Sequence, residues 1–505
     1  MRQNLSDNTH SYRRRHDPLS MIRSSRRALL GLLAAMALLL TDNMTAQASI
    51  GFYIGKNLTE DGSVILAGYG DEPSSHWVEI VPRKHYPSDA RIKVGATPKA
   101  LYPGQLIEIP QVPETCKYIT SNYSAYAGFP APLTNGGLNE HHVAARDIWS
   151  PSRSELQQMT PKPQRGLNYS DLSRIVMERA HTAREAVQIV GSLIDRYGFC
   201  TYGGNSHMFA DSNEGWVLIN FAGGQGLWIA QRLGPDTFRV SHPGYILEIP
   251  LDFQKNPNYM GSKNFISFAV QQGWYDPQSG KPFNVNQIYG DAQGRAEAVV
   301  RLEAKVAQLA PHVRVKDLMA ILRTTALDSS GYGQIAHLRT DRRKQLGILW
   351  VAPASPLTAP FIPLRLGMTD VPPEYKRHRY LTEDEAAAFM DPNYRGLEST
   401  RYAFRACKRL FYLVHEHRDK FQNQVVDALT AFENKLISQQ ELVERTARTL
   451  YQAGQDDLAR HYLTYYGKTE ALKALRLVEA LSQSIELQTK VLFDIRQPDT
   501  TEGHQ

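Results

Sequence analysis

The chain has 505 residues, of which 42% are hydrophobic and 21% are charged. These fractions exclude a disordered chain, a collagen-like fibre and a protein with many membrane spans. The three cysteines are too few for a disulfide framework and lack the C-x-x-C spacing typical of zinc and redox motifs: Cys116, Cys200 and Cys407. We therefore expect a globular protein without the usual zinc and redox motifs.

The first 48 residues are typical of an export signal. Residues 1–27 contain seven arginines, and an unbroken apolar run follows from Ala28 to Leu40. This run is short for a membrane span but suits the hydrophobic part of a signal peptide. The sequence Ala46-Gln47-Ala48 then supplies the small side chains that signal peptidase accepts. We expect cleavage after Ala48 and a periplasmic or secreted protein that begins at Ser49; an uncleaved anchor is the alternative.

The basic balance of the chain lies mostly in this leader. Its seven arginines against three aspartates give +4 of the total formal charge of +6, so residues 49–505 carry about +2. Such a small charge gives no reason to expect a nucleic-acid partner or binding to acidic membranes. We expect no stable membrane insertion after the leader is removed, and the sequence leaves open whether the protein forms a homo-oligomer.

A mature chain that begins at Ser49 would have a reactive group at its N-terminus. A free α-amine has a pKa of about 7.7–8.0, so a useful fraction is an unprotonated base near neutral pH. An N-terminal serine can therefore supply nucleophile and general base from one residue. Because signal peptidase often leaves a serine by chance, position alone does not establish catalysis.

The segment that follows Ser49 predicts a hairpin. Residues 49–56 form an apolar run typical of a buried strand, Asp61-Gly62 is a strong turn signal, and residues 63–67 form the second strand. A nucleophile at the free start of such a strand is the opening of an N-terminal-nucleophile (Ntn) hydrolase. In this opening the chain resembles the Ntn dipeptidases, the family of bacterial dipeptidase A and the secernins, which share Gly55-Lys56 and Asp61-Gly62-Ser63 at this spacing.

Later segments resemble the same family in the same order. They cover roughly residues 49 to 380 and are Ile109–Thr115 (IPQVPET), Gly137–Ala144 (GLNEHHVA), Glu178–Val187 (ERAHTAREAV), Ala210–Leu218, Leu349–Leu364 and Asp370–Tyr375. The resemblance implies a four-layer αββα sandwich, whereas the pattern of elements alone indicates only an α+β fold. It also implies amide hydrolysis with Ser49 as nucleophile.

Three departures from the family affect the site. The family nucleophile is Cys, and Ser49 replaces it with a poorer but chemically viable group. The family also has an arginine where this chain has Gly68, which leaves Asp71 to hold the amine of Ser49 and puts the usual substrate range in doubt. His242 stands where relatives have an asparagine for the oxyanion or the substrate, and a histidine can still donate one hydrogen bond there.

Two further asparagines complete the predicted site. Asn139 lies in a loop that the resemblance places near the nucleophile, where it could donate to the oxyanion; a turn or capping role is equally compatible with its position. Asn205 follows Gly203-Gly204, which we interpret as a turn, and could line the substrate site. We interpret the histidines of His141-His142 and His415-Glu416-His417 as solvated side chains, since neither group has the spacing of a zincin motif.

The rest of the chain divides into two parts. The predicted strands 77–82, 217–220, 228–232 and 238–241 flank two helices, the first capped by Ser170 and the second by Thr182 with Glu185 and ended by Gly198. Residues 383–491 show helical periodicity with no strand-like run. We therefore predict an Ntn-hydrolase domain at 49–382 and a helical segment with a loose tail at 383–505.

The sequence thus predicts an exported amide hydrolase, a dipeptidase-like peptidase acting on small peptides through an acyl-enzyme. This mechanism needs no metal and no organic cofactor. An acylase or acyltransferase for non-peptide amides would use the same intermediate, and the glycine at position 68 favours such a change of substrate. A binding protein on a catalytically inactive scaffold is the alternative outside enzymes.

Overall fold

The computed structural model describes residues 49–494, apart from 73, 125, 242–245, 292–296, 327–329, 341–342 and 379–399. The predicted leader, His242 and the start of the predicted C-terminal segment therefore lie outside the described residues. Among the helices that the structure describes, none has the length and apolar character needed to span a membrane.

The first sheet places the start of the described chain in its interior. Its antiparallel strands run in the order β15 (Phe238–Ser241), β1 (Ile50–Ile54), β2 (Val64–Gly70), β19 (Tyr332–Leu338), β20 (Ile348–Ala352) and β21 (Ile362–Arg365). The register pairs Gly51 with Ser241 on one side and with Gly68 on the other. Every residue of β1 is buried, which explains its unbroken apolar sequence.

The second sheet is also antiparallel and contains nine described strands. Its order is β17 (Tyr259–Gly261), β14 (Trp228–Leu233), β13 (Gly215–Asn220), β12 (Asn205–Ala210), β11 (Ala144–Ile148), β10 (Gly136–Asn139), β8 (Tyr118–Tyr123) and β3 (His76–Val81), with β9 (Leu133–Thr134) beside β8. Three small ladders pair β4 (Lys84–His85) with β7 (Glu114–Thr115), β5 (Arg91–Gly95) with β6 (Leu106–Pro110), and β16 (Glu248–Ile249) with β18 (Phe283–Asn284).

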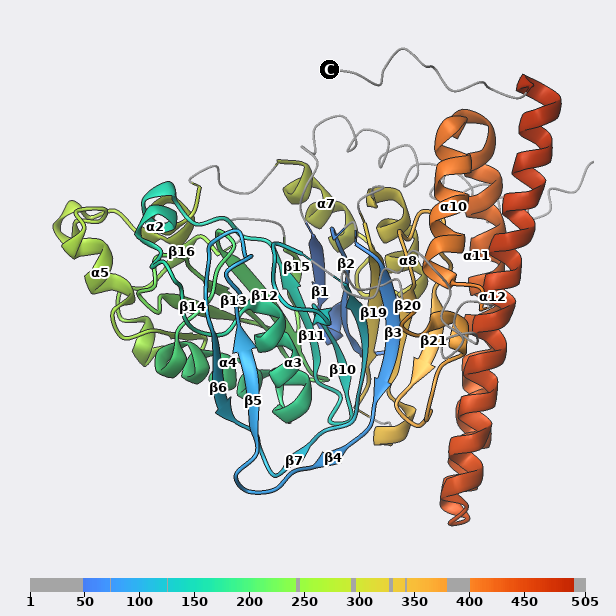
Figure 1. Cartoon of the computed structure of the whole chain (residues 1–505), viewed down its shortest axis with the longest axis horizontal. Helices are drawn as coiled ribbons and strands as arrows, with labels where there is room; N and C mark the ends of the chain where they lie inside the picture. Colours follow the sequence, from blue (N-terminus) through green and yellow to red (C-terminus); the bar gives the residue numbers. More distant parts are fainter. Residues whose placement is uncertain are drawn as a thin grey trace, which may run out of the picture. The chain divides into compact units, whose positions relative to one another are not determined.

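Helices cover the outer faces of the two sheets (Figure 1). The α-helices are α2 (Ser154–Met159), α3 (Tyr169–Arg179), α4 (Ala183–Tyr197), α5 (Phe265–Gln271), α6 (Val285–Tyr289), α7 (Glu297–Ala307), α8 (Val315–Thr325), α10 (Ala403–Glu416), α11 (Arg418–Gln452) and α12 (Asp456–Phe493). Short 3-10 turns lie at η1 (Lys56–Leu58), η2 (Phe253–Lys255), η3 (Pro277–Ser279), η4 (Lys344–Leu346) and η5 (Pro373–Tyr375).

Alternation of side chains along the strands separates the core into layers. Tyr53 and Leu66 point between the sheets and pack with Met208 of β12. Their neighbours Phe52 and Ala67 point the other way, into a cluster with α8. On the far side of the second sheet, residues of α3 and α4 form a third cluster with β12 to β14. The four-layer αββα sandwich expected from the sequence is therefore confirmed.

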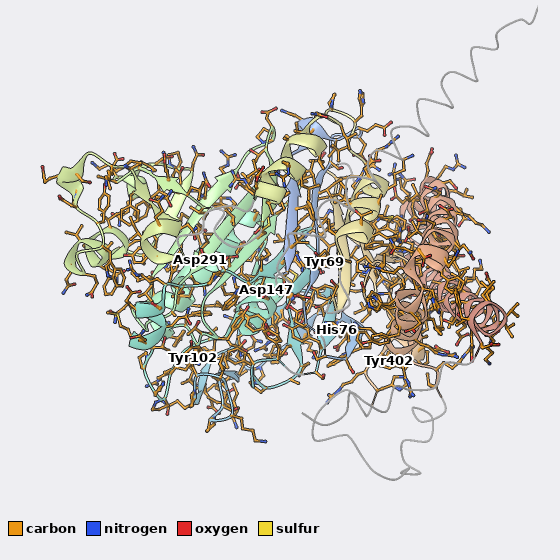
Figure 2. All side chains as sticks on the ribbon, turned by 90° about the horizontal axis from the view of Figure 1, so that it is seen from above. Tyr69, His76, Tyr102, Asp147, Asp291 and Tyr402 are labelled. Carbon is orange, nitrogen blue, oxygen red and sulfur yellow. The ribbon has the colours of Figure 1, made fainter. Side chains whose placement is uncertain are left out.

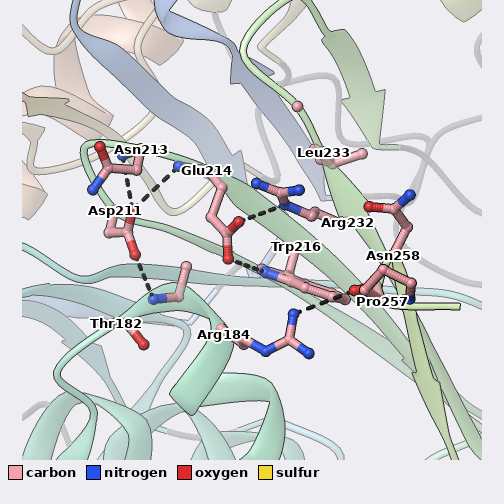
Figure 3. A network of polar contacts seen from close by, with 12 residues as sticks. Thr182, Arg184, Asp211, Asn213, Glu214, Trp216, Arg232, Leu233, Pro257 and Asn258 are labelled. Carbon is pink, nitrogen blue, oxygen red and sulfur yellow. Dashed lines mark hydrogen bonds and ion pairs between the residues drawn. The ribbon is translucent and has the colours of Figure 1, made fainter.

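The start of α4 is tied to the second sheet by a polar network (Figure 3). Thr182 caps the helix as predicted, accepting a hydrogen bond from the Glu185 N–H at 3.0 Å. Asp211 accepts one from the Ala183 N–H at 2.9 Å, and Glu214 binds Trp216 Nε1 at 2.8 Å. The predicted cap of α3 was wrong, because Asn168 rather than Ser170 begins that helix with a capping box.

One of the three C-terminal helices, α11, is bound to the sandwich by buried ion pairs. Arg323 of α8 makes two hydrogen bonds to Glu433 of α11, at 2.6 and 3.0 Å, and both side chains are at most 3% exposed. Glu433 also accepts from the Phe361 N–H at 2.8 Å. Arg365 of β21 forms a second buried ion pair with α11, in which its Nη1 donates to Glu444 at 3.0 Å. The helical segment therefore packs on the core, as its composition predicted.

Replacing Glu433 by alanine should destabilise the protein by about 3–5 kcal/mol, because it leaves the Arg323 guanidinium buried without its counter-charge. Urea denaturation of the two proteins measures the loss. The matched control is Glu479→Ala, which removes the partially exposed partner of Arg401 and should cost no more than about 1 kcal/mol. Equal losses in the two variants would contradict this assignment.

Candidate active site

Ser49 lies at the entry to β1 with its side chain 6% exposed. Because side chains alternate along a strand, it shares a face with Gly51 and Tyr53, which point between the two sheets. Its Oγ accepts a hydrogen bond from the backbone N–H of Asp71 at 3.2 Å. The structure therefore brings two predicted site residues, Ser49 and Asp71, together at the end of the β1–β2 pair.

A buried arginine that the sequence analysis missed lies beside this pair. Arg146 of β11 is fully buried and crosses from the second sheet to the first. Its Nε donates to the carbonyl oxygen of Ile50 at 2.9 Å, and its Nη1 donates to the Tyr332 hydroxyl at 3.0 Å. Its Nη2 is buried with no hydrogen-bond partner among the described residues. A positive charge therefore lies against the peptide group that joins Ile50 to Gly51, one residue beyond Ser49.

Gly68 is what makes room for this guanidinium. A Cβ added at Gly68 would lie 2.4 Å from Arg146 Nε and 2.1 Å from the Ile50 carbonyl oxygen. The position where the resemblance leads one to expect an arginine is thus filled by an arginine from the opposite sheet. The one available sequence signal was a charged pair, Arg146-Asp147, within the otherwise apolar strand that ends at Ile148.

Two buried acids lie near enough to the arginine for its charge to act on them. Glu72 accepts from Asn135 Nδ2 at 2.7 Å, and burial raises the pKa of its carboxyl to about 7 despite that hydrogen bond and the charge of Arg146. Burial and the nearby Glu72 also raise the pKa of Asp147 well above its usual range. Asp147 lies inside the sandwich (Figure 2), on the face of β11 opposite to Arg146, close to a cluster of tyrosines.

His76 closes the side of the site next to Glu72. Its ring stacks on Tyr123 at 5.1 Å and lies 5.4 Å from the ring of Phe404 (Figure 2 labels His76). Nδ1 donates to the Ser74 carbonyl at 2.6 Å, which leaves Nε2 facing Glu72 at 3.9 Å. Burial lowers the pKa of His76 to about 3, so the ring is neutral at physiological pH.

The structure does not bring Asn139 or Asn205 to Ser49. Asn139 lies at the far end of β10 from Gly136, the residue paired with Arg146. Its amide donates to the carbonyls of Met177 and Ala180, and its oxygen accepts from two backbone N–H groups of the following turn. These contacts fit the turn interpretation, and they use both amide donors.

Asn205 is fully buried at the start of β12 and accepts from the Tyr202 hydroxyl at 2.9 Å. By strand alternation it faces the helical layer, whereas Ser49 faces the space between the sheets. Its Nδ2 has no partner among the described residues. His242, the remaining predicted residue, lies outside the described residues.

The interpretation of His141 as a solvated side chain is corrected. It lies against His181 with the ring centroids 4.0 Å apart, and the two rings form a group with Cys116 that could hold a metal ion. Burial and the adjacent His181 lower the pKa of His141 to about 4, and burial raises the pKa of the Cys116 thiol to about 11. This group lies on the Asn139 side of the second sheet, away from Ser49.

Comparison with known families decides the relationship. The profile of Peptidase family C69 matches residues 48–318, just over half of the chain.

The chain belongs to peptidase family C69.

Curated relatives of this C69 member carry the name of dipeptidases. This chain is 25% identical over 253 residues to a probable dipeptidase of Latilactobacillus sakei, and the match covers 50% of each chain. It is 24% identical over 269 residues to probable dipeptidase B of Streptococcus pyogenes serotype M3, covering 52% of this chain and 49% of that one. A 125-residue match to a probable dipeptidase of Salmonella dublin reaches 34% identity, over 25% and 27% of the two chains. The chain spans about half the length of the first and second of these relatives.

Among solved structures, this C69 member aligns with a mutant of the conjugated bile acid hydrolase from Clostridium perfringens. That alignment has a TM-score of 0.27 and 12% sequence identity, and covers 60% of this chain and 89% of the other. The family assignment rests on the sequence profile.

Gly68→Ala should destabilise this C69 member by at least about 1–3 kcal/mol, because the added methyl group overlaps the Ile50 carbonyl and the Arg146 guanidinium. Thermal or urea unfolding measures the effect. Gly234→Ala is the matched control, since the nearest atom to its added Cβ is 3.8 Å away, and it should leave the unfolding midpoint nearly unchanged. A neutral Gly68→Ala would show that Arg146 does not occupy this space.

Glu72 should make stability depend on pH. Its pKa is raised from 4.5 to about 7 in the folded chain, so the folded state binds more protons than the unfolded state between these values. The free energy of unfolding should therefore fall as pH rises from 5 to 7. Glu72→Gln keeps an acceptor for Asn135 and should reduce this slope; the exposed Glu441→Gln should not. Urea midpoints measured at pH 5, 6, 7 and 8 test this, and an unchanged slope would contradict a buried, neutral Glu72.

Proposed function

We propose that this protein is an exported, dipeptidase-like amide hydrolase that uses Ser49, as the first residue of its processed chain, as the nucleophile. The observation that carries the proposal is the position of Ser49 in a family C69 chain. It stands at the start of an interior strand, and its Oγ is held by the Asp71 N–H. The names of the relatives and the small-x-small sequence before Ser49 support the substrate class and the export.

In this mechanism Ser49 Oγ attacks the carbonyl carbon of the scissile amide. The free α-amine of Ser49, which removal of the leader would create, accepts the hydroxyl proton and returns it to the leaving amine. The acyl-enzyme ester is then hydrolysed by water, with the same amine as the base. In the proposal Asp71, whose backbone N–H binds Ser49 Oγ, orients this amine with its carboxylate. Serine is a weaker nucleophile than cysteine, so the mechanism relies on accurate positioning of both groups.

Arg146 is the residue that we assign to electrostatic support of this step. Its guanidinium is fixed by Ile50 and Tyr332 and is excluded from water. A charge acts more strongly in the protein interior than in solvent. Positive charge next to the nucleophile favours the negative charge that develops on the tetrahedral intermediate. The same charge disfavours protonation of the Ser49 amine, which keeps the base available near neutral pH.

Ser49→Ala in the exported protein should abolish hydrolysis of dipeptides, lowering kcat by at least about 1,000-fold, since it removes the nucleophile but leaves the amine. Ser49→Cys should retain activity, because cysteine supplies a stronger nucleophile at the same position. Both variants are compared after intact mass has shown that the chain begins at residue 49.

The same experiment separates the alternatives. Retained activity in Ser49→Ala, or a mature chain that begins elsewhere, would contradict the mechanism. Activity on acyl amides but not on dipeptides, lost in Ser49→Ala, would show an acylase on the same machinery. An acyl group passed to an added amine would show a transferase, and no reaction of correctly processed protein with any amide would favour a binding protein.

A further inference from the structure

The second sheet carries a cluster of metal-binding side chains that the proposed hydrolysis does not use. Cys116 follows β7, His141 lies in the turn between β10 and β11, and His181 lies between α3 and α4. One ligand atom from each lies within 4.8 Å of the other two. Cys116 is buried, His141 is partly buried and His181 is exposed, so the group opens to solvent on one side only.

The backbone around His141 and His181 is fixed by the side-chain amide of Asn139, and that around Cys116 by a backbone hydrogen bond to α3. Asn139 Oδ1 accepts from the His141 N–H at 3.0 Å, and Asn139 Nδ2 donates to the Ala180 carbonyl, just before His181, at 2.7 Å. The Cys116 N–H donates to the Glu178 carbonyl at 2.8 Å, in the last turn of α3. The three segments are thus connected directly, so the ligands are brought together before any ion binds.

The histidine rings are presented in a consistent way. His181 Nδ1 lies 3.9 Å from Glu185 Oε2, and the same oxygen accepts the His181 backbone N–H at 2.7 Å. His141 Nδ1 lies 3.2 Å from Lys344 Nζ. On His181 this leaves Nε2 as the nitrogen for a metal, and on His141 Nε2 becomes available once Lys344 has moved away from Nδ1. A carboxylate behind the other nitrogen, as Glu185 is behind His181, is the usual outer partner of a metal-bound histidine.

We propose that Cys116, His141 and His181 form a binding site for Zn²⁺, with solvent as the fourth ligand. A thiolate and two imidazoles suit this borderline-soft ion, and three protein ligands with an open position form a common tetrahedral zinc arrangement. Zinc bonds of about 2.0–2.3 Å place ligand atoms roughly 3.3–3.6 Å apart. The exposed His181 ring can make the required movement of about 1 Å. On binding, the Zn–S bond replaces the Cys116 S–H bond, and the thiol proton goes to solvent.

Lys344 competes with the ion for this site. When its ammonium donates to His141 Nδ1, the ring proton lies on Nε2, which then has no lone pair for the metal. Its positive charge also repels Zn²⁺, while Glu140 and Glu185 attract it and Arg83 is paired with Glu114 and Glu140. The Lys344 side chain is exposed, so it can turn into solvent as the ion binds.

Metal content and spectroscopy of the purified full-length protein test the site without reference to hydrolysis. Zn²⁺ binding is measured by calorimetry and by metal analysis after dialysis, and Co²⁺ is used as a spectroscopic substitute. We expect one ion per chain and a thiolate-to-cobalt charge-transfer band. Cys116→Ser should remove that band. His181→Ala, an exposed substitution that leaves the core intact, should weaken Zn²⁺ binding at least tenfold, whereas the exposed His312→Ala should not.

Lys344→Ala gives the most specific readout, because it should bind Zn²⁺ more tightly than the unmodified protein by about tenfold or more. Lys316→Ala, which removes an exposed lysine elsewhere, is its control. Absence of stoichiometric binding at micromolar Zn²⁺ would overturn the proposal. So would a charge-transfer band that persists in Cys116→Ser, or a Lys344→Ala affinity that is unchanged or lower.

Discussion

The burial of one positive charge between the two sheets organises the centre of this molecule. A guanidinium stays charged in any protein environment, so Arg146 must find its hydrogen-bond acceptors inside the sandwich. It takes them from β1 through Ile50 and from β19 through Tyr332, and the acids Glu72 and Asp147 lie close by. The arginine therefore fixes the spacing of the sheets at the point where Ser49 enters the fold.

The same principle connects the C-terminal helices to the sandwich. Arg323 and Arg365 are charged side chains of the sandwich that are buried. Glu433 and Glu444 of α11 form ion pairs with them. The described part of residues 45–505 forms one compact unit. The described helices from Ala403 onward therefore belong to the same compact unit as the sandwich, and the sandwich without α11 would retain uncompensated buried arginines.

Local features of the fold could be predicted from sequence because they depend on neighbours along the chain. The β1 run, the turn at Gly62, the Thr182 cap and the stop at Gly198 are set by side-chain alternation, capping and glycine conformations. The cap of α3 was misplaced because Asn168 and Ser170 are both good capping residues and only the observed hydrogen bonds separate them.

Features that depend on tertiary contact could not be predicted in this way. Four layers followed from the family resemblance, since the pattern of elements alone gives only α+β. The Arg146 side chain occupies the space that a side chain at position 68 would fill. Because these two residues lie on different sheets, their spacing along the chain does not indicate this contact. The residues of the proposed zinc site are also far apart in the sequence, with 25 positions between Cys116 and His141 and 40 between His141 and His181. No local sequence motif therefore predicts that they lie close together.

The burial of Ser49 also constrains when the proposed removal of the leader could take place. A peptidase needs several residues on each side of the bond it cuts in an extended, accessible form. In the folded chain, residues 50–54 are an interior strand with hydrogen-bonded neighbours on both sides, and Ser49 is almost inaccessible. An external peptidase that cuts before Ser49 must therefore act before β1 pairs with β2 and β15, while this segment is still unfolded.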